Sequence, residues 1–364
     1  MTPNDAAMAP DGSGDPFLDV IRLTPSAPVT ATDAAEAVRA SFGLTGELDR
    51  LPGEADDNFA LRTRDGRRYV VKVAHARADP RVVSLQVRVL QHLEAAAGEL
   101  PVPRVVPSLD GPPWAAIADG PLRGRLVHVT TYLDGQLLRS VPASAALRRK
   151  VGETLASLGR ALRAFDDPLV HRPLLWDIAQ LPRLRPLLAE LPPGPATGRL
   201  DEQLTRFTAE VAPRLAAQRT QLVHNDFSPD NVLISADASR VCGIIDFGDL
   251  TVTALVNDAA VAAANLLSAE TDFLRPALDL ISGYHATTPL TVGELDLLPD
   301  LMLARIVARL VISEWRAVRF PENRGYILRN TAQARAHLSR LRTIEVDEIT
   351  ARVHDACRPE ASHA

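Results

Sequence analysis

Hydrophobic and polar residues alternate along the segment 58–73, which predicts two short β-strands joined at Asp65-Gly66. Asp-Gly is common in two-residue hairpin loops because both residues tolerate the positive φ of a type I′ turn. Tyr69, Val71 and Val73 share one face of the second strand. Successive side chains of a strand point to opposite faces, so Lys72 is expected on the other face with Val70.

A helix is predicted next, because Asp79 and Pro80 match an N-cap followed by proline at the first helical position, and Gly98 marks the end. Its apolar residues recur at intervals of three and four and are Val82, Leu85, Val89, Leu90 and Leu93. Gln86 falls on or beside that face, and we expect the helix to pack against the sheet. Further β segments are predicted around 114–118 and 126–132.

From Ala145 onward the apolar spacing becomes helical, which indicates a change of architecture. A second hairpin is predicted over 232–235 and 241–245. A capping box at Thr291–Glu294 and a long apolar helix over 299–318 follow. The fold class is therefore α+β, with a small β-rich lobe that carries one main helix, and a larger, mainly helical lobe.

Four segments follow from these changes of pattern. We expect a tail over 1–15, a nucleotide-binding lobe over 16–133, a helical catalytic and substrate lobe over 134–350, and a C-terminal tail over 351–364.

The composition of the 364 residues is that of an ordinary soluble globular protein, with 46% hydrophobic and 23% charged residues. A formal net charge of −5 provides no broad positive field, so nucleic acid and membrane surfaces are excluded as main partners. Two cysteines build no disulfide framework and no four-cysteine zinc site, which favours a reducing, cytoplasmic location. No apolar segment is long enough to span a bilayer, and nothing in the sequence predicts an oligomeric state.

The chemistry is concentrated between His224 and Asp246. His224, Asp226 and Asn231 have the spacing H-x-D-x-x-x-x-N, and Asp-Phe-Gly begins at Asp246, directly after the second predicted hairpin. Antiparallel pairing places Asn231 beside Asp246, and two oxygen ligands suit Mg²⁺, which fills its shell with water and substrate phosphates. Asp226 is suited to receive the proton of an attacking hydroxyl in phosphoryl transfer. Lys72 is one of only two lysines in the chain and is a candidate clamp for the α/β-phosphates.

With these residues, the chain resembles the aminoglycoside phosphotransferase and choline kinase superfamily, and most closely its hydroxylysine kinase-like branch. The resemblance runs from about residue 51 to 341 and is strongest over 222–258. It implies a two-lobed, protein-kinase-like fold that uses Mg²⁺ and ATP or GTP to phosphorylate a hydroxyl group of a small amine or amino acid. The residues that it places on the nucleotide side are Lys72, Gln86, Asn58 and the hinge Thr130, Thr131, Tyr132 and Leu133. It implies that Asp226 is the base, that Asn231 and Asp246 are metal ligands, and that His224 and Asp258 support the loop.

Three departures from the pattern of these kinases have physical consequences. Asn225 stands in place of a glycine, which is tolerated if the site needs positive φ. Gln86 stands where many relatives have a glutamate, so an ion pair with Lys72 becomes at best a neutral hydrogen bond. The segment after Leu51 has one glycine and three acids in place of a glycine-rich loop.

The acceptor side has candidates of a different kind. Candidates that could hold the ammonium or carboxylate group of an amino acid are Asp177, Trp176, Trp315, Arg316 and Tyr326. The tryptophans are equally typical of core packing. Two other functions stay open at this point. One is an aminoglycoside-type antibiotic phosphotransferase, which needs an acid-rich pocket, and the other is a catalytically impaired, nucleotide-binding regulatory protein.

Overall fold

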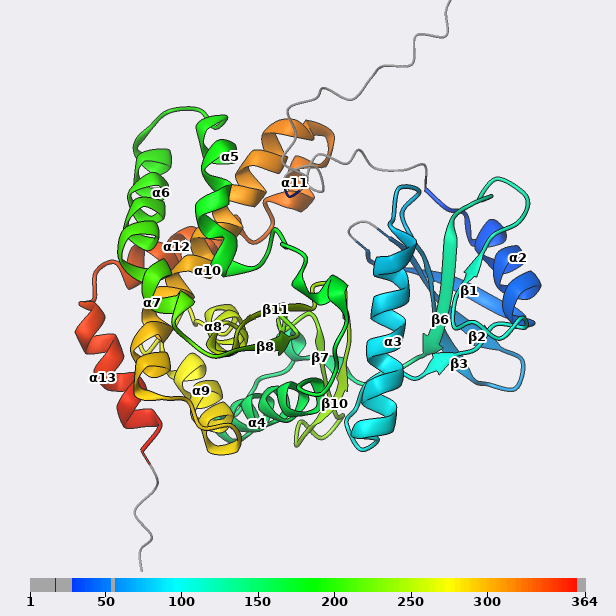
Figure 1. Ribbon diagram of the computed structural model, residues 1–364, viewed down its shortest axis with the longest axis horizontal. Coiled ribbons are helices and arrows are strands. Elements are labelled where there is room, and N and C mark those ends of the chain that lie inside the picture. Colours follow the sequence, from blue (N-terminus) through cyan, green and yellow to red (C-terminus); the bar gives the residue numbers. More distant parts are fainter. Residues whose placement is uncertain (1–16, 18–27, 54–55, 359–364) are drawn as a thin grey trace, which may run out of the picture.

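An antiparallel sheet forms the centre of the first lobe in the computed structural model, which describes residues 17, 28–53 and 56–358 (Figure 1). Its strands lie in the order β1-β2-β3-β6-β4, and β5 also pairs with β6. The strands are β1 (Gly46–Leu51), β2 (Asp57–Thr63), β3 (Arg68–Val73), β4 (Val105–Val106), β5 (Ala115–Ala116) and β6 (Leu126–Thr131). The helix α2 (Ala31–Phe42) buries Val38 and Phe42 in the same core as Val71 and Val73.

The first predicted hairpin is confirmed, and its alternation places Lys72 as expected. Val71 and Val73 are fully buried, whereas Lys72 keeps 23% of its side chain exposed. The turn differs from the type I′ prediction, because φ is positive at Gly66 (84°) but not at Asp65. The Thr63 backbone N–H donates to the Arg67 carbonyl at 3.0 Å, so the loop contains more than the two residues of a type I′ hairpin.

The predicted helix is α3 (Pro80–Ala96), which begins after Asp79, whose carboxylate accepts from the Arg81 backbone N–H. Its packing differs from the expectation. Leu85 and Val89 belong to the core of the helical lobe, and Val83 packs with Leu126 of the sheet. The helix therefore lies between the two lobes, as Figure 1 shows. Gln86 lies on this helix and is therefore placed near the interface between the two lobes.

The second lobe is mainly helical and contains two small sheets, β10-β9-β7 and β11-β8. Its strands are β7 (Gln136–Leu137), β8 (Thr220–Val223), β9 (Val232–Ile234), β10 (Val241–Ile244) and β11 (Thr251–Ala254). Its α-helices are α4 (Ala145–Leu162), α5 (Arg185–Ala189), α6 (Pro195–Arg206), α7 (Ala212–Ala216), α8 (Leu255–Asn265), α9 (Arg275–Thr287), α10 (Val292–Arg319), α11 (Arg324–Ile327), α12 (Thr331–Leu341) and α13 (Val346–Ala356). None of the helices in the described ranges is both long and apolar enough to cross a bilayer.

Helix α10 runs through the lobe and begins earlier than expected. The capping box at Thr291 and Glu294 is present, and it caps the same helix that was expected to begin at Pro299. Pro299 lies inside α10, where it removes one N–H but is buried among apolar neighbours. Helices α4 and α9 approach so closely that a Cβ added to Gly283 would lie 2.0 Å from the Arg149 carbonyl oxygen.

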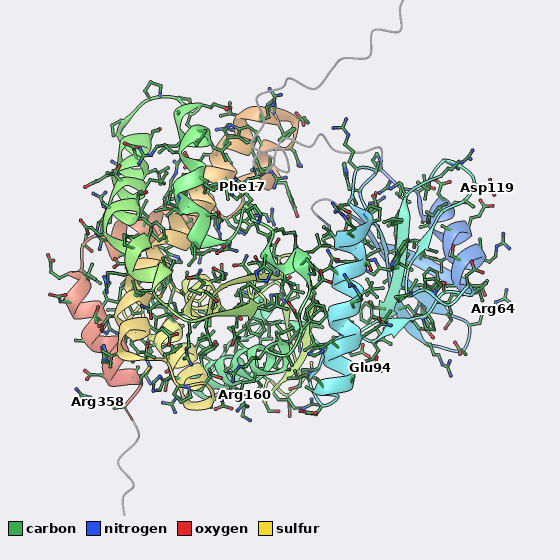
Figure 2. The ribbon with its side chains drawn as sticks, in the orientation of Figure 1. Phe17, Arg64, Glu94, Asp119, Arg160 and Arg358 are labelled. Atoms are coloured by element: carbon green, nitrogen blue, oxygen red, sulfur yellow. The ribbon has the colours of Figure 1, made fainter. Side chains whose placement is uncertain are left out.

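The ends of the expected segments shift in two places. Phe17, expected in the first lobe, packs into the core of the helical lobe beneath the Arg183 guanidinium (Figure 2). Helix α13 extends to Ala356 and buries Val353, so part of the expected C-terminal tail belongs to the lobe. The expected N-terminal tail over 1–15 and the last six residues lie outside the described residues.

Candidate active site

The loop after β8 and the segment after β10 meet at the face of the helical lobe that carries the second hairpin. Strands β9 and β10 pair as predicted, and the Ile245 backbone N–H donates to the Asn231 carbonyl at 2.9 Å. This bond holds Asn231 next to Asp246. The two proposed metal ligands are therefore brought together by the geometry of a three- to four-residue antiparallel ladder.

Asp226 is fixed by partners on both carboxylate oxygens. Its Oδ2 accepts from Asn231 Nδ2 at 2.7 Å, and its Oδ1 accepts from Arg305 Nη2 at 2.8 Å. Burial raises the pKa of this carboxyl, the Arg305 cation opposes the rise, and the nearby Asp246 carboxylate adds to it. Its side chain remains 27% exposed, which leaves it open to a reactant.

Lys72 reaches across from the first lobe to the same place. Its Nζ lies 3.8 Å from Asp246 Oδ1, and its positive charge lowers the pKa of Asp246. Because 55% of the Asp246 side chain is exposed, this pair is open to solvent and to ligands. The structure thus brings Lys72 of strand β3 close to Asp246, as the sequence predicted.

Gln86 and Asn58 flank the lysine. A Cβ added to Gly248 would lie 3.7 Å from Gln86 Nε2, so Gln86 faces the Asp-Phe-Gly segment. It forms no hydrogen bond with Lys72 among the described residues. Asn58 is opposite Lys72 in the β2–β3 register, and its amide donates to the Pro52 carbonyl at 3.1 Å.

His224 and Asp258 lie beneath the loop. The buried His224 ring is 3.2 Å from the Ile245 carbonyl through Nε2, and Nδ1 accepts from the Asp226 backbone N–H at 3.4 Å. Burial lowers the pKa of His224 to about 4, so the ring is neutral at pH 7. The Asp258 carboxylate accepts from the backbone N–H groups of His224 and Asn225 at 3.4 and 2.9 Å. Asn225 has φ of 66°, so the condition under which Asn can replace a glycine at this position is met.

The segment expected to face adenine leaves the sheet at the end of β6. Thr130 is buried, and the Thr131 hydroxyl accepts from the Arg104 backbone N–H at 2.9 Å. The Tyr132 N–H donates to the Arg68 carbonyl, and the Arg68 guanidinium lies 4.5 Å from the Tyr132 ring centroid. Neither the Tyr132 carbonyl nor the Leu133 N–H enters a backbone hydrogen bond with the described residues. Both groups are available to a ligand.

The donor set of the loop fits a hard cation. Because Asn231 directs its amide nitrogen to Asp226, no described group donates to its Oδ1, and that oxygen is free to bind a metal. Asp246 has φ of 64° and exposes its carboxylate beside it. An amide oxygen and a carboxylate, with open positions for water and phosphate oxygens, are suitable ligands for Mg²⁺.

Arg305 of α10 is a residue of the site that motif reading missed. Only 5% of its side chain is exposed, and besides Asp226 it contacts the Trp176 carbonyl through Nη1 at 3.1 Å. Its guanidinium also lies 5.0 Å from the Trp176 ring centroid, which brings Trp176 close to Asp226. A single arginine in a long helix has no motif, so only its polarity on an otherwise apolar face could have indicated it.

Asp249, three residues after Asp246, is a second residue to which sequence reasoning gave no role. Burial and the charges of Asp226 and Asp246 raise its pKa, and Arg305 and Arg172 oppose the rise. The Arg172 guanidinium donates to the carbonyls of Gly248 and Leu250 at 3.0 and 3.1 Å. The loop that carries Asp249 is held in this way.

The expected acceptor residues do not gather at one point. Asp177 is buried, caps the short helix η3 (Ile178–Leu184), and accepts from Thr253 Oγ1 at 3.0 Å. Trp315 is also buried, and its Nε1 donates to Glu190 Oε2 at 2.6 Å. These contacts satisfy both side chains within the protein. Arg316 and Tyr326 lie near each other, with Tyr326 46% exposed.

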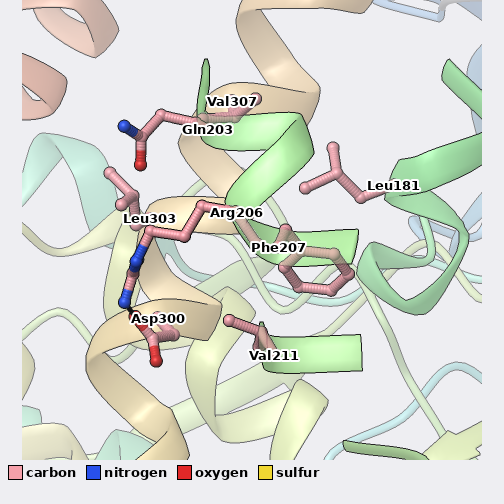
Figure 3. Close-up of a pocket in the computed structure, with 9 residues that line it drawn as sticks. Leu181, Gln203, Arg206, Phe207, Val211, Asp300, Leu303 and Val307 are labelled. Carbon is pink, nitrogen blue, oxygen red and sulfur yellow. Dashed lines mark hydrogen bonds and ion pairs between the residues drawn. The ribbon is translucent and has the colours of Figure 1, made fainter. Parts of the chain in front are cut away.

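A small cavity lies elsewhere in the helical lobe, between η3, α6, η4 (Phe207–Val211) and α10 (Figure 3). Its volume of about 10 Å³ is room for about one water. The Arg206–Asp300 ion pair, at 2.6 Å, lies at its edge, and the other lining residues are mostly apolar. It does not include Asp226, Asp246 or Lys72, and it is not the candidate site.

Comparison with known proteins agrees with this geometry. The profile of the phosphotransferase enzyme family (APH) matches residues 47–298, more than half of the chain, and the chain therefore belongs to that family. It is a small-molecule kinase, a phosphotransferase with an alcohol group as acceptor, and the family implies ATP as donor.

Individual relatives and structures agree with the family. The chain is similar to a hydroxylysine kinase of Danio rerio (25% identity, 88% of this chain and 94% of the relative). It is also similar to a homoserine kinase of Acidiphilium cryptum (27%, 74% and 81%). An amicoumacin kinase in complex with AMP-PNP, Ca²⁺ and Ami has a TM-score of 0.67 at 17% identity, over 88% of this chain and 94% of that one. A microcompartment-associated aminopropanol kinase has a TM-score of 0.59 at 17% identity, over 86% and 98%. These structures establish the kinase-like fold that was expected.

Proposed function

We propose that this kinase transfers the γ-phosphoryl group of ATP, with Mg²⁺, to the hydroxyl of a small hydroxy amino acid or amino alcohol. The observation that carries the proposal is the meeting of Lys72 with Asp246, beside the bonded pair of Asp226 and Asn231. The four groups come from three separate segments of the chain. A purely structural loop would not require a lysine from the other lobe.

Each side chain has a role that its surroundings support. Asp226 receives the proton of the acceptor hydroxyl, and its two hydrogen-bond partners hold it in place. Lys72 binds phosphate oxygens, and Asn231 and Asp246 hold the metal ion. A bound Mg²⁺ neutralises charge that develops on the transferred phosphoryl group. The neutral His224 and the buried Asp258 hold the loop backbone through the bonds described above.

The acceptor class is inferred from the relatives and from the intact site. Kinases of hydroxylysine and homoserine act, by their names, on hydroxy amino acids, and the aminopropanol kinase acts on an amino alcohol. The impaired regulatory protein is the weaker alternative, because base, metal ligands and lysine are all present. An antibiotic acceptor is the other alternative, and the assay below includes it.

The test is an acceptor screen with purified protein and Mg-ATP or Mg-GTP. The acceptors are hydroxylysine, homoserine, ethanolamine, choline and several aminoglycosides. Turnover is measured by the release of nucleoside diphosphate, and the product is identified by phosphorus NMR. Asp226→Asn should keep nucleotide binding and lower kcat by about 10²- to 10⁴-fold, because it removes a positioned base. Full turnover by that variant would refute the role of Asp226. Turnover of aminoglycosides alone would replace the proposed acceptor class.

A further inference from the structure

A row of arginines on α10 extends from the proposed base. Arg309 follows Arg305 by four residues, and Arg316 follows Arg309 by seven. With 3.6 residues per turn, the three side chains leave the helix within about 40° of one another. Arg305 contacts Asp226 at 2.8 Å, so the row begins at the reacting position and continues along the helix away from it.

Arg309 is a half-buried cation that has no carboxylate partner. Its Nη2 donates to the Asn265 side-chain oxygen, and it forms no ion pair with the residues that the structure describes. Burial and the Arg305 charge together lower the pKa of Arg309 to about 10. The carboxylates that act on it, Asp226 and Asp230, already have Arg305 and Arg139 as partners at 2.8 and 2.9 Å.

Arg329, just after α11, adds a second cation to this place. Its Nη1 donates to the Tyr326 carbonyl at 2.9 Å, and its guanidinium lies 3.8 Å from the Tyr326 ring centroid. Its charge acts on both Arg309 and Arg316. Stacking on Tyr326 fixes the guanidinium without neutralising it, and no ion pair of Arg329 occurs within the described part of the chain.

Some enclosed arginines elsewhere in the molecule have acidic partners, whereas Arg172 donates to backbone carbonyls and has the charges of Asp249 and Asp167 acting on it. Arg125 pairs with Asp57 at 2.9 Å, and Arg148 pairs with Asp279 at 2.7 Å. Gathering like charges without a counter-ion costs free energy, most of all where water is partly excluded. The half-buried Arg309 and the exposed Arg329 are two like charges that act on each other with no ion pair among the described residues, and this points to an anionic ligand.

We propose that Arg309 and Arg329 bind the carboxylate of the acceptor, which makes the acceptor a hydroxy amino acid and not an amino alcohol or an aminoglycoside. The inference rests on the function proposed above. A guanidinium fork matches a carboxylate in two parallel hydrogen bonds, and this fixes the orientation of an acceptor whose hydroxyl faces Asp226. The same two cations repel a polycationic antibiotic.

A phosphate group of the nucleotide is the other anion that could satisfy these arginines. The triphosphate is proposed to lie at Lys72 and Asp246, whereas the row on α10 starts on the Arg305 side of Asp226. The KM for ATP distinguishes the two anions, because only phosphate binding makes it depend on Arg309 and Arg329.

The experiment compares matched acceptors with and without the carboxylate. Homoserine is paired with homoserinol, and hydroxylysine with its carboxamide, in wild type, Arg309→Gln, Arg329→Gln and the control Arg342→Gln. Arg342 pairs with Glu202 at 3.0 Å at a distant surface. Loss of one charge-assisted pair should lower kcat/KM for the amino acid by about 10- to 100-fold. The kcat/KM for the alcohol or amide and the KM for ATP should be unchanged in these variants. The control Arg342→Gln should behave like wild type with every acceptor.

Three results would overturn the inference: equal loss for both members of a pair, a raised KM for ATP, or no preference of wild type for the carboxylate. Calorimetric titration of homoserine and hydroxylysine into wild type and variants with AMP-PNP tests the same site without turnover. If both compounds bind in a way that depends on both arginines but neither is phosphorylated, the proposed reaction is refuted and the carboxylate site is not. If neither amino acid binds but an amino alcohol is phosphorylated, the carboxylate site alone is refuted.

Discussion

Replacing Arg305 with methionine should move the pH dependence of turnover, because this arginine acts through Asp226. The Arg305 cation donates to Asp226 Oδ1 at 2.8 Å and is 5% exposed. Methionine keeps much of the apolar volume and removes the charge. The carboxylate must be ionised to receive a proton, and burial already raises its pKa. Without the cation the pKa of Asp226 rises further, so activity is lost at a higher pH than in wild type.

The magnitude follows from the distance. Two unit charges about 4 Å apart interact by about 4 kcal/mol at an effective dielectric constant near 20, which equals about three pKa units. Asp226 is 27% exposed, and water screens part of this interaction. We therefore expect the acid limb of the kcat/KM profile to move upward by about one to two pH units.

The assay is kcat/KM for the acceptor between pH 5 and about 9, where a carboxylate base titrates out at the acid end. Arg305→Met should recover activity at the alkaline end, whereas Arg305→Lys, which keeps the charge, should hold the limb near its wild-type pH. Circular dichroism of each variant checks the fold. An acid limb that does not move in a folded Arg305→Met protein would show that the cation does not set the ionisation of Asp226.

Two further predictions concern stability, measured as urea midpoints. Asn225 has φ of 66°, and neither side-chain amide atom has a hydrogen-bond partner. Asn225→Gly should therefore be tolerated, whereas Asn225→Ala should lower the free energy of unfolding by about 1–2 kcal/mol. Equal urea midpoints for the two variants would contradict the role of backbone strain. Gly283→Ala would bring a Cβ to 2.0 Å from the Arg149 carbonyl and should cost at least about 2 kcal/mol. Gly198→Ala, where a Cβ meets nothing within 4 Å, is its control, and a similar midpoint for both would refute the close α4–α9 contact.

The fold was predictable where local pattern and tertiary packing agree. The hairpins, the Asp79-Pro80 helix start and the Thr291–Glu294 capping box all appear in the structure. Prediction failed where a contact distant in sequence decides. Helix α3 buries Leu85 and Val89 in the second lobe, which no local pattern reveals. Pro299 stays inside α10 because packing outweighs the one hydrogen bond that a proline removes.

The two halves of the site differ in how they are encoded, and this explains what sequence reasoning missed. Asn231 and Asp246 flank one short hairpin, so backbone pairing alone brings them together and leaves a compact motif. Arg305 and Arg309 reach the same place on a helix that begins 61 residues after Asn231, at Val292. On that helix, arginines spaced by four and seven residues are typical of a solvated stripe, and only the burial of Arg305 beside Asp226 indicates a role in the site. The candidate nucleotide-binding residues can therefore be recognised from sequence motifs. The candidate acceptor-binding residues can be recognised only once the structure places helix α10 against the loop.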